Sequence, residues 1–257
     1  MTPARVMLVD DDASIRRFVE MALEGLGIDL LLCAGVTEAL TELHEHGPVE
    51  LLMTDLMMPR ENGLALLKRL SDEPALRGRA RIVVFSAGLR GPMQSELEGH
   101  DVWRQLSKPV SAMELEACVR DGVAAASASV RPLLDGPILQ GPERGDPEGL
   151  DDNALVAITT NFRGDRDLYL AFRDGCVAQF ASDMSRGDAS LANLDLSDLR
   201  HLAHSLKSVL ALLGHGASAR IARQLEDCTA RHEATQTSIL WHQLRSNLVE
   251  LIALARS

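Results

Sequence analysis

Five short apolar segments alternate with helical patterns over the first 120 residues, and this alternation limits the fold more than any other feature of the sequence. The segments are "RVMLV" (5–9), "DLLLC" (29–33), "ELLMT" (50–54), "RIVVF" (81–85) and the weaker "VWRQL" (102–106). They are apolar throughout rather than at alternate positions, which is typical of parallel strands buried on both faces. We therefore predict an α/β fold with a doubly wound, five-stranded parallel sheet.

Helical periodicity fills the intervals between these segments. Helices are expected at 14–26, 36–46, 63–70 and 92–99, and from 111 onward. Ser111 and Glu114 have the spacing of a capping box, which marks the start of the last helix. In such folds ligands gather at the carboxyl ends of the strands.

The pattern changes after residue 126. The stretch "SASVRPLLDGPILQGPERGDPEG" is rich in Pro, Gly and Ser, as linkers are. Beyond it no strand pattern remains, and helices are expected at 151–162, 166–186, 196–213 and 217–255, the last broken near 232–238. We predict an α/β domain at 1–125, a flexible linker at 126–150 and an all-α four-helix bundle at 151–257.

The composition argues against several classes of function. The chain carries 26 Lys and Arg against 37 Asp and Glu, a formal net charge of −11, and both halves are acidic. Neither half has the basic surface of a nucleic-acid binder. The four cysteines lie far apart, and no apolar run reaches the ~18 residues of a membrane span. We expect a soluble, cytoplasmic protein without membrane insertion.

Five residues with phosphoryl-transfer chemistry stand at the ends of four predicted strands. Asp10 and Asp11 follow the first strand, Asp55 the third, Ser86 the fourth and Lys108 the fifth. Adjacent carboxylates repel one another, and a site built from oxygen ligands favours Mg²⁺. Asp55 could then act as a carboxylate nucleophile, while the hydroxyl and the ammonium bind phosphoryl oxygens.

A structural interpretation of the same residues is also open. Asp11 and Asp12 could cap the first helix, Asp55 could begin a turn, and Lys108 could be a solvated surface charge. Each of these alternatives is reasonable for one residue alone. The coincidence of all of them at successive strand ends favours a functional site.

The segments "VMLVDDDASIRR", "MTDLMMPRENG", "VVFSAG" and "LSKPV" resemble the signature segments of bacterial response-regulator receiver domains, which have a flavodoxin-like fold. The resemblance covers residues 1 to about 125. It implies that Asp55 is the phosphoacceptor and that Asp10 and Asp11 are the acidic pair. Asp11, Asp55 and the carbonyl of Met57 would hold Mg²⁺.

The resemblance also implies roles at the fourth and fifth strands. Ser86 would be the switch hydroxyl, and Lys108 the phosphoryl-binding lysine with a cis bond to Pro109. Receiver domains usually carry Phe or Tyr three residues before this lysine, whereas this chain has Gln105 there and Trp103 two residues earlier. The sequence therefore leaves open how this domain responds to phosphorylation at the usual aromatic position.

A histidine and a lysine mark the helix expected at 196–213. On a helical wheel His204 points away from the apolar stripe, beside Lys207, Ser208 and Ala211. We expect an exposed imidazole that accepts a phosphoryl group, with the ammonium three residues later reaching its oxygens. The stripe itself consists of Leu199, Leu202, Leu206, Val209, Leu210 and Leu213.

The segment "HLAHSLKSVLALLG", with "NFRGDRDLYLAF" before it and "IARQLE" after it, resembles histidine-containing phosphotransfer (HPt) domains. That resemblance implies a four-helix bundle with an extra amino-terminal helix over residues 150–257. The family pattern is H-x-L-K-G with a second glycine ten residues after the histidine. Here Ser208 replaces the first glycine, while Gly214 matches the second.

Other interpretations of this helix remain open. His201 and His204 could bind a metal, although no third ligand is evident, or the polar face could simply be solvated. A kinase dimerisation helix also presents a histidine, but no Gly-rich ATP-binding segment follows. A DNA-binding output domain is opposed by the acidic charge and by the lack of a basic recognition helix.

We therefore predict a phosphorelay protein phosphorylated on Asp55 and carrying a phosphoryl group on His204. It would be a phosphotransfer protein without a kinase domain, whose receiver catalyses its own phosphorylation. The expected partners are a sensor histidine kinase or hybrid kinase and another receiver or HPt protein. The alternative is an adaptor whose bundle binds a protein partner under the control of Asp55 phosphorylation, without relaying phosphate. The sequence leaves the oligomeric state open.

Overall fold

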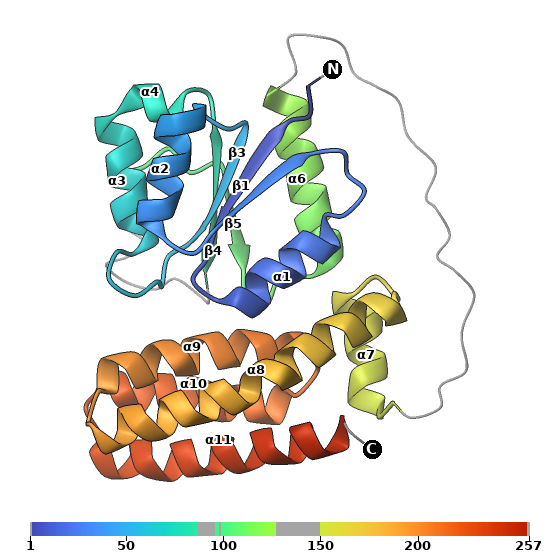
Figure 1. The fold of residues 1–257 in the computed structure, drawn as a ribbon, viewed down its shortest axis with the longest axis vertical. Helices are drawn as coiled ribbons and strands as arrows, with labels where there is room; N and C mark the ends of the chain where they lie inside the picture. Colours follow the sequence, from blue (N-terminus) through green and yellow to red (C-terminus); the bar gives the residue numbers. More distant parts are fainter. Residues whose placement is uncertain (1, 87–95, 98, 127–149, 256–257) are drawn as a thin grey trace. The chain divides into compact units, whose positions relative to one another are not determined.

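The computed structural model describes residues 2–86, 96–97, 99–126 and 150–255. It divides into two compact units, Met1–Gly145 and Asp146–Ser257, which are described separately below (Figure 1). The expected linker at 126–150 lies almost wholly outside the described residues. Most of the helix expected at 92–99 lies outside them as well.

The first unit is the predicted five-stranded parallel sheet, in the order β2-β1-β3-β4-β5. Its strands are β1 (Arg5–Val9), β2 (Asp29–Cys33), β3 (Leu51–Asp55), β4 (Arg81–Ser86) and β5 (Arg104–Ser107). Its described helices are α1 (Ala13–Ala22), α2 (Val36–His46), α3 (Gly63–Asp72), the short α4 (Pro74–Arg77) and α6 (Ala112–Ala126). The doubly wound α/β prediction is confirmed.

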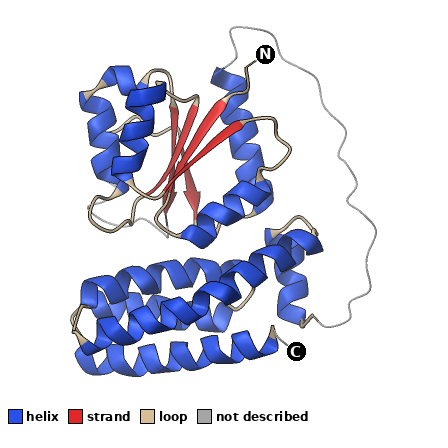
Figure 2. Cartoon of the chain, in the orientation of Figure 1, coloured by secondary structure: helices blue, strands red, loops and turns tan. Residues whose placement is uncertain are grey.

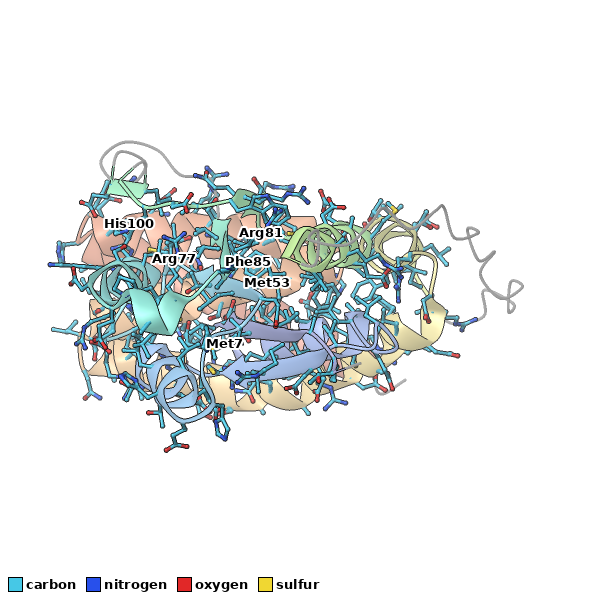
Figure 3. All side chains as sticks on the ribbon, turned by 90° about the horizontal axis from the view of Figure 1, so that it is seen from above. Met7, Met53, Arg77, Arg81, Phe85 and His100 are labelled. Carbon is cyan, nitrogen blue, oxygen red and sulfur yellow. The ribbon has the colours of Figure 1, made fainter. Side chains whose placement is uncertain are left out.

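Helices cover both faces of this sheet (Figures 1 and 2). Helices α2, α3 and α4 lie on one face, and α1 and α6 lie on the other. The central strands are buried except at their first residues in β1 and β4, Arg5 and Arg81, which is why they are nearly continuous apolar runs in the sequence. Met7, Met53 and Phe85, labelled in Figure 3, belong to three neighbouring strands and are nearly inaccessible to solvent.

The last helix of the first unit begins with the expected capping box. The Ser111 backbone N–H donates to Glu114 Oε2 at 3.1 Å, and the Glu114 N–H donates back to Ser111 Oγ at 3.3 Å. These two bonds satisfy backbone donors that the helix start leaves without partners.

The described residues of the second unit form helices and the turns that join them, without a strand. Its helices are α7 (Asp152–Asn161), α8 (Arg166–Ala192), α9 (Leu196–Leu212), α10 (Gly216–Ala230) and α11 (Ala234–Leu254). The long final segment is broken at 231–233, close to the expected position. Aspartates at 151, 165 and 195 cap α7, α8 and α9 through their side chains.

Helix α8 is longer than the sequence predicts, because it continues six residues beyond the expected end at 186. Gly187 and the polar residues around it favour a helix end by propensity alone. In the structure, however, the Trp241 ring of α11 packs so closely that a Cβ at Gly187 would overlap it. Trp241 is fully buried, and its indole N–H donates to Asp188 Oδ1 at 2.9 Å. Tertiary packing thus keeps this turn helical.

None of the helices in the described parts of the chain combines the length and the apolar character needed to cross a membrane.

Candidate functional site

The sheet brings four predicted site residues to one edge. Asp10 follows β1, Asp55 ends β3, Ser86 ends β4 and Lys108 follows β5. Because all the strands are parallel, their carboxyl ends meet there. Gly63 begins α3 directly against this edge, since a Cβ at that position would overlap the Asp55 carbonyl oxygen.

Asp10, Asp11 and Asp55 form an acidic cluster. Ligand oxygens from the three carboxylates all lie within 4.8 Å of one another, and Asp10 and Asp55 are buried. Burial, together with the charges of Asp55 and Asp12, raises the pKa of Asp10 to about 7 against the opposing effect of Lys108. The pKa of Asp11 is raised by burial and by the charges of Asp55 and Asp12. The cluster therefore holds an excess of negative charge that a cation would relieve.

Lys108 is the cation that the protein itself supplies. Its Nζ lies 2.8 Å from Asp10 Oδ2 and 2.9 Å from Asp55 Oδ2, and its side chain is only 6% exposed. Burial alone would lower the pKa of Lys108, but the two carboxylates outweigh it and raise the pKa above its usual value. Lys108 is thus a charged, buried ammonium and not a solvated surface residue. Its bond to Pro109 is cis, as expected.

The helix-capping interpretation holds for one aspartate only. Asp12 caps α1, because its Oδ1 accepts the backbone N–H groups of Ser14 and Ile15. Asp10 instead faces Lys108, and its Oδ1 also accepts the Asp12 N–H at 2.9 Å. The Met57 N–H donates to Asp55 Oδ1 at 3.2 Å, which holds the loop after β3 against the cluster.

The residues near the usual aromatic position lie on the last strand of the sheet. Gln105 is exposed in β5. Trp103 lies just before the strand, and its ring is flanked by the guanidinium groups of Arg81 at 4.7 Å and Arg104 at 4.4 Å. Stacked arginines restrain the indole in this position.

A second group of polar side chains lies between α9 and α10. His204 Nδ1 is 2.8 Å from Glu226 Oε1, and Lys207 Nζ is 2.6 Å from Glu226 Oε2. The expectation of an exposed imidazole is wrong, because His204 is only 4% exposed. A wheel shows which side of a helix faces away from its own apolar stripe, but it omits groups from other elements such as Glu226.

The hydrogen bond to Glu226 determines the tautomer of His204. An ionised carboxylate only accepts hydrogen bonds, so Nδ1 must carry a proton, and in the neutral form of the ring Nε2 then holds the lone pair. The 3.3 Å approach of Lys207 Nζ to Nδ1 is then a close contact, since a protonated nitrogen cannot accept a hydrogen bond. Burial opposes ionisation of Glu226, but the hydrogen bond from His204 and the charge of Lys207 lower its pKa to about 2.

The small residues near His204 serve packing within the bundle. Ser208 is buried rather than solvent-facing as expected, and its hydroxyl donates to the His204 carbonyl at 3.5 Å. Gly214 has a φ of 89°, and a Cβ there would crowd the Asn153 carbonyl of α7. The glycine therefore ends α9 and admits α7 at the same point.

The metal-binding interpretation of His201 and His204 gains no support. Within the described residues, the acidic cluster of Asp10, Asp11 and Asp55 is the one group of His, Cys, Asp and Glu side chains placed to share an ion.

Comparison with known families decides what these two units are. Residues 6–120 match the family model of the response regulator receiver domain, and residues 171–254 match that of the Hpt domain. The chain joins a receiver domain to an Hpt domain. Each of the two family models falls within one of the two units described above.

Individual relatives match the receiver domain. Response regulator Rre1 of Synechocystis sp. is 34% identical over 129 residues, which are 49% of this chain and 54% of that protein. Protein PilG of Pseudomonas aeruginosa is 28% identical over 117 residues, 45% of this chain and 84% of PilG. The chain spans about half the length of the first curated relatives it matches. The structure of chemotaxis protein CheY4 of Vibrio cholerae covers 46% of this chain and 98% of its own, with 22% identity and a TM-score of 0.43.

The main residue that sequence reasoning missed is Glu226 in the Hpt domain. It lies within the segment "IARQLE", beside the buried Leu225, Cys228 and Thr229 of α10. An acidic residue next to an apolar stripe is a weak sign of a buried partner. Only the packing of α10 on α9 shows that the partner is His204.

Proposed function

We propose that this chain carries phosphoryl groups on Asp55 and on His204 and exchanges them with other two-component proteins. The observation that carries the proposal is the meeting of Asp10, Asp11, Asp55 and Lys108 at one sheet edge. There a nucleophilic carboxylate, a set of oxygen ligands and a buried cation stand together.

The acidic cluster fits Mg²⁺, because it offers several oxygen donors within reach of one ion and carries excess negative charge. Asp10, Asp11, Asp55 and the carbonyl of Met57 would hold the ion. When bound, it would neutralise charge on the phosphoryl oxygens.

Asp55 would attack the phosphorus of a phosphohistidine in a partner. A carboxylate oxygen forms the new P–O bond while the P–N bond breaks, and the bonding electrons return to the imidazole. Lys108 already contacts Asp55, so its ammonium would lie close enough to bind an oxygen of the phosphoryl group on Asp55. The Ser86 hydroxyl, at the end of the neighbouring strand, would donate a hydrogen bond to one of them.

His204 would carry its phosphoryl group on Nε2. Glu226 supports this role by keeping the proton on Nδ1. The same bond holds the ring in one orientation and stabilises the positive charge that the ring gains when it is phosphorylated. The reverse transfer would release a neutral imidazole.

The partners would be a sensor histidine kinase or hybrid kinase and a further receiver or Hpt protein. Two phosphoryl carriers in one chain suit an intermediate position in a relay.

The test is to treat the full chain with phosphoramidate and Mg²⁺ and to measure intact masses. We expect Asp55→Asn to retain one phosphoryl group that is stable in base, and His204→Gln to retain one that hydroxylamine removes. The double variant should take up none. If His204 is never labelled while Asp55 is, the bundle is an adaptor rather than a carrier. If neither residue is labelled, the whole proposal fails.

A further inference from the structure

Lys207 contacts His204, and two arginines, Arg186 and Arg200, act electrostatically on the neighbouring His201. Two of these three cations, Lys207 and Arg186, are already paired. Lys207 Nζ donates to Glu226 Oε2 at 2.6 Å. Arg186 of α8 binds the Asp198 carboxylate through Nε and Nη2. The charges of Lys207 and Arg186 are therefore balanced by carboxylates in this state of the domain.

Lys207 lies beside Nδ1 of the imidazole, so its ammonium is not placed to contact a phosphoryl group on Nε2. Its ammonium is 3.3 Å from Nδ1, the nitrogen that donates to Glu226. Nδ1 and Nε2 are on opposite sides of the ring. In this geometry Lys207 orients the Glu226 carboxylate, which in turn orients His204.

Arg200 is the third cation, and it is differently placed. It stands four residues before His204, on the same side of α9. Helical side chains lean toward the amino terminus of their helix, so the imidazole leans over the turn that carries Arg200. Arg200 Nε is buried and has no hydrogen-bond acceptor among the described residues. A buried donor without an acceptor is costly, and an anion beside it would remove that cost.

The neighbouring His201 does not compete for this role. Burial lowers the pKa of His201, and the charges of His204 and Arg200 lower it further. His201 is therefore neutral at neutral pH, which leaves Arg200 as the permanent charge on this turn.

We infer that Arg200 binds the phosphoryl group on Nε2 of His204, and that Lys207 acts through Glu226 as a positioning residue. The inference rests on the proposed function of His204. The buried Nε–H of Arg200 would donate a charge-assisted hydrogen bond to a phosphoryl oxygen.

The experiment uses the full chain with Asp55→Asn, so that the phosphoryl group on His204 cannot pass to the chain's own receiver domain. Phosphoramidate labels His204 as Nε2 forms a P–N bond, the donor's P–N bond breaks and ammonia leaves. The rates of labelling, of later hydrolysis and of transfer to an added His204→Gln chain are followed by intact mass for Arg200→Met, Arg200→Lys and Lys207→Met. Arg223→Met, a change of the same type at an exposed position on α10, is the matched control. Urea unfolding checks that each variant is folded.

We expect Arg200→Met to slow labelling or to speed hydrolysis by about 10-fold or more, as loss of a charge-assisted hydrogen bond implies. Arg200→Lys should recover part of the effect, and Arg223→Met should behave like the parent. Lys207→Met should slow labelling without speeding hydrolysis, because it disturbs the orientation of the ring before the bond forms.

Two results would overturn the inference while leaving the proposed function intact. In one, Arg200→Met is labelled and hydrolysed like the parent. In the other, only transfer to an added receiver slows, which would assign Arg200 to the partner's carboxylates instead of the phosphoryl group. If the Asp55→Asn chain is not labelled on His204 at all, the proposed function itself has failed.

Discussion

The ionisation of the Glu226 carboxylate makes the stability of the Hpt domain depend on pH. Burial opposes its ionisation, but the hydrogen bond from His204 and the charge of Lys207 bring its pKa down to about 2 from an ordinary 4.5. Because the pKa is lower in the folded state, the carboxylate stabilises the fold above about pH 4.5, and this contribution is lost as the pH falls toward 2.

We therefore expect Glu226→Gln to lower the free energy of unfolding at neutral pH, and the difference from wild type to shrink between about pH 4.5 and 2. Urea titrations at a series of pH values measure this difference. A difference that stays constant across the acidic range would show that the loss does not arise from the Glu226 charge.

At the receiver edge, two adjacent aspartates have separate tasks. Asp11 belongs to the acidic cluster, whereas Asp12 caps α1. We expect Asp11→Asn to weaken Mg²⁺ binding roughly 10-fold or more, because it removes a charge from the ion's ligand set. Asp12→Asn should have little effect, since Asn caps helices about as well as Asp.

Isothermal titration calorimetry of the full-length variants compares the two affinities. Equal losses of affinity for Asp11→Asn and Asp12→Asn would mean that the ion responds to the total charge of the loop and not to a defined ligand.

Among the helices, α8 shows how packing overrides local propensity. Alanine stabilises the interior of a helix by about 0.5–1 kcal/mol relative to glycine, so propensity predicts that Gly187→Ala is stabilising. The structure predicts the opposite, because the new Cβ would overlap the buried Trp241 ring. We expect a loss of about 1–3 kcal/mol, as found for overpacked cores.

The sign of this change, measured by urea unfolding, decides between the two effects. Ser190→Ala, one turn further along α8, is a comparison variant that removes a hydroxyl bonded to the Arg186 carbonyl and to Asp198 Oδ2. A stabilised Gly187→Ala variant would show that α8 and α11 are not packed as closely as described.

At the scale of the whole molecule, each domain contains its own candidate site. The acidic cluster and Lys108 belong to the receiver domain, and His204 with Glu226 belongs to the Hpt domain. The contacts given above for each site join described residues of one domain only.

We therefore expect two inactive chains to complement each other. Phosphorylated Asp55→Asn chain, mixed with His204→Gln chain and Mg²⁺, should pass its phosphoryl group to Asp55 of the second chain. The rate should rise with the concentration of the acceptor chain, as followed by intact mass. Transfer that occurs in the wild-type chain but never in the mixture would mean that the two sites work only when covalently joined.

The sequence by itself determined the architecture of both domains and the residues of the receiver edge. Continuous apolar strands, helical periodicity and the capping box are local patterns, and parallel strands must bring residues such as Asp55 and Lys108 to a common edge. The surroundings of His204 were decided only by tertiary structure. The wheel placed the imidazole correctly relative to the stripe of α9, but which group faces it depends on the packing of α10. Glu226, the burial of His204 and the continuation of α8 past Gly187 all arise from contacts between residues that lie far apart in the chain, and no local pattern encodes them.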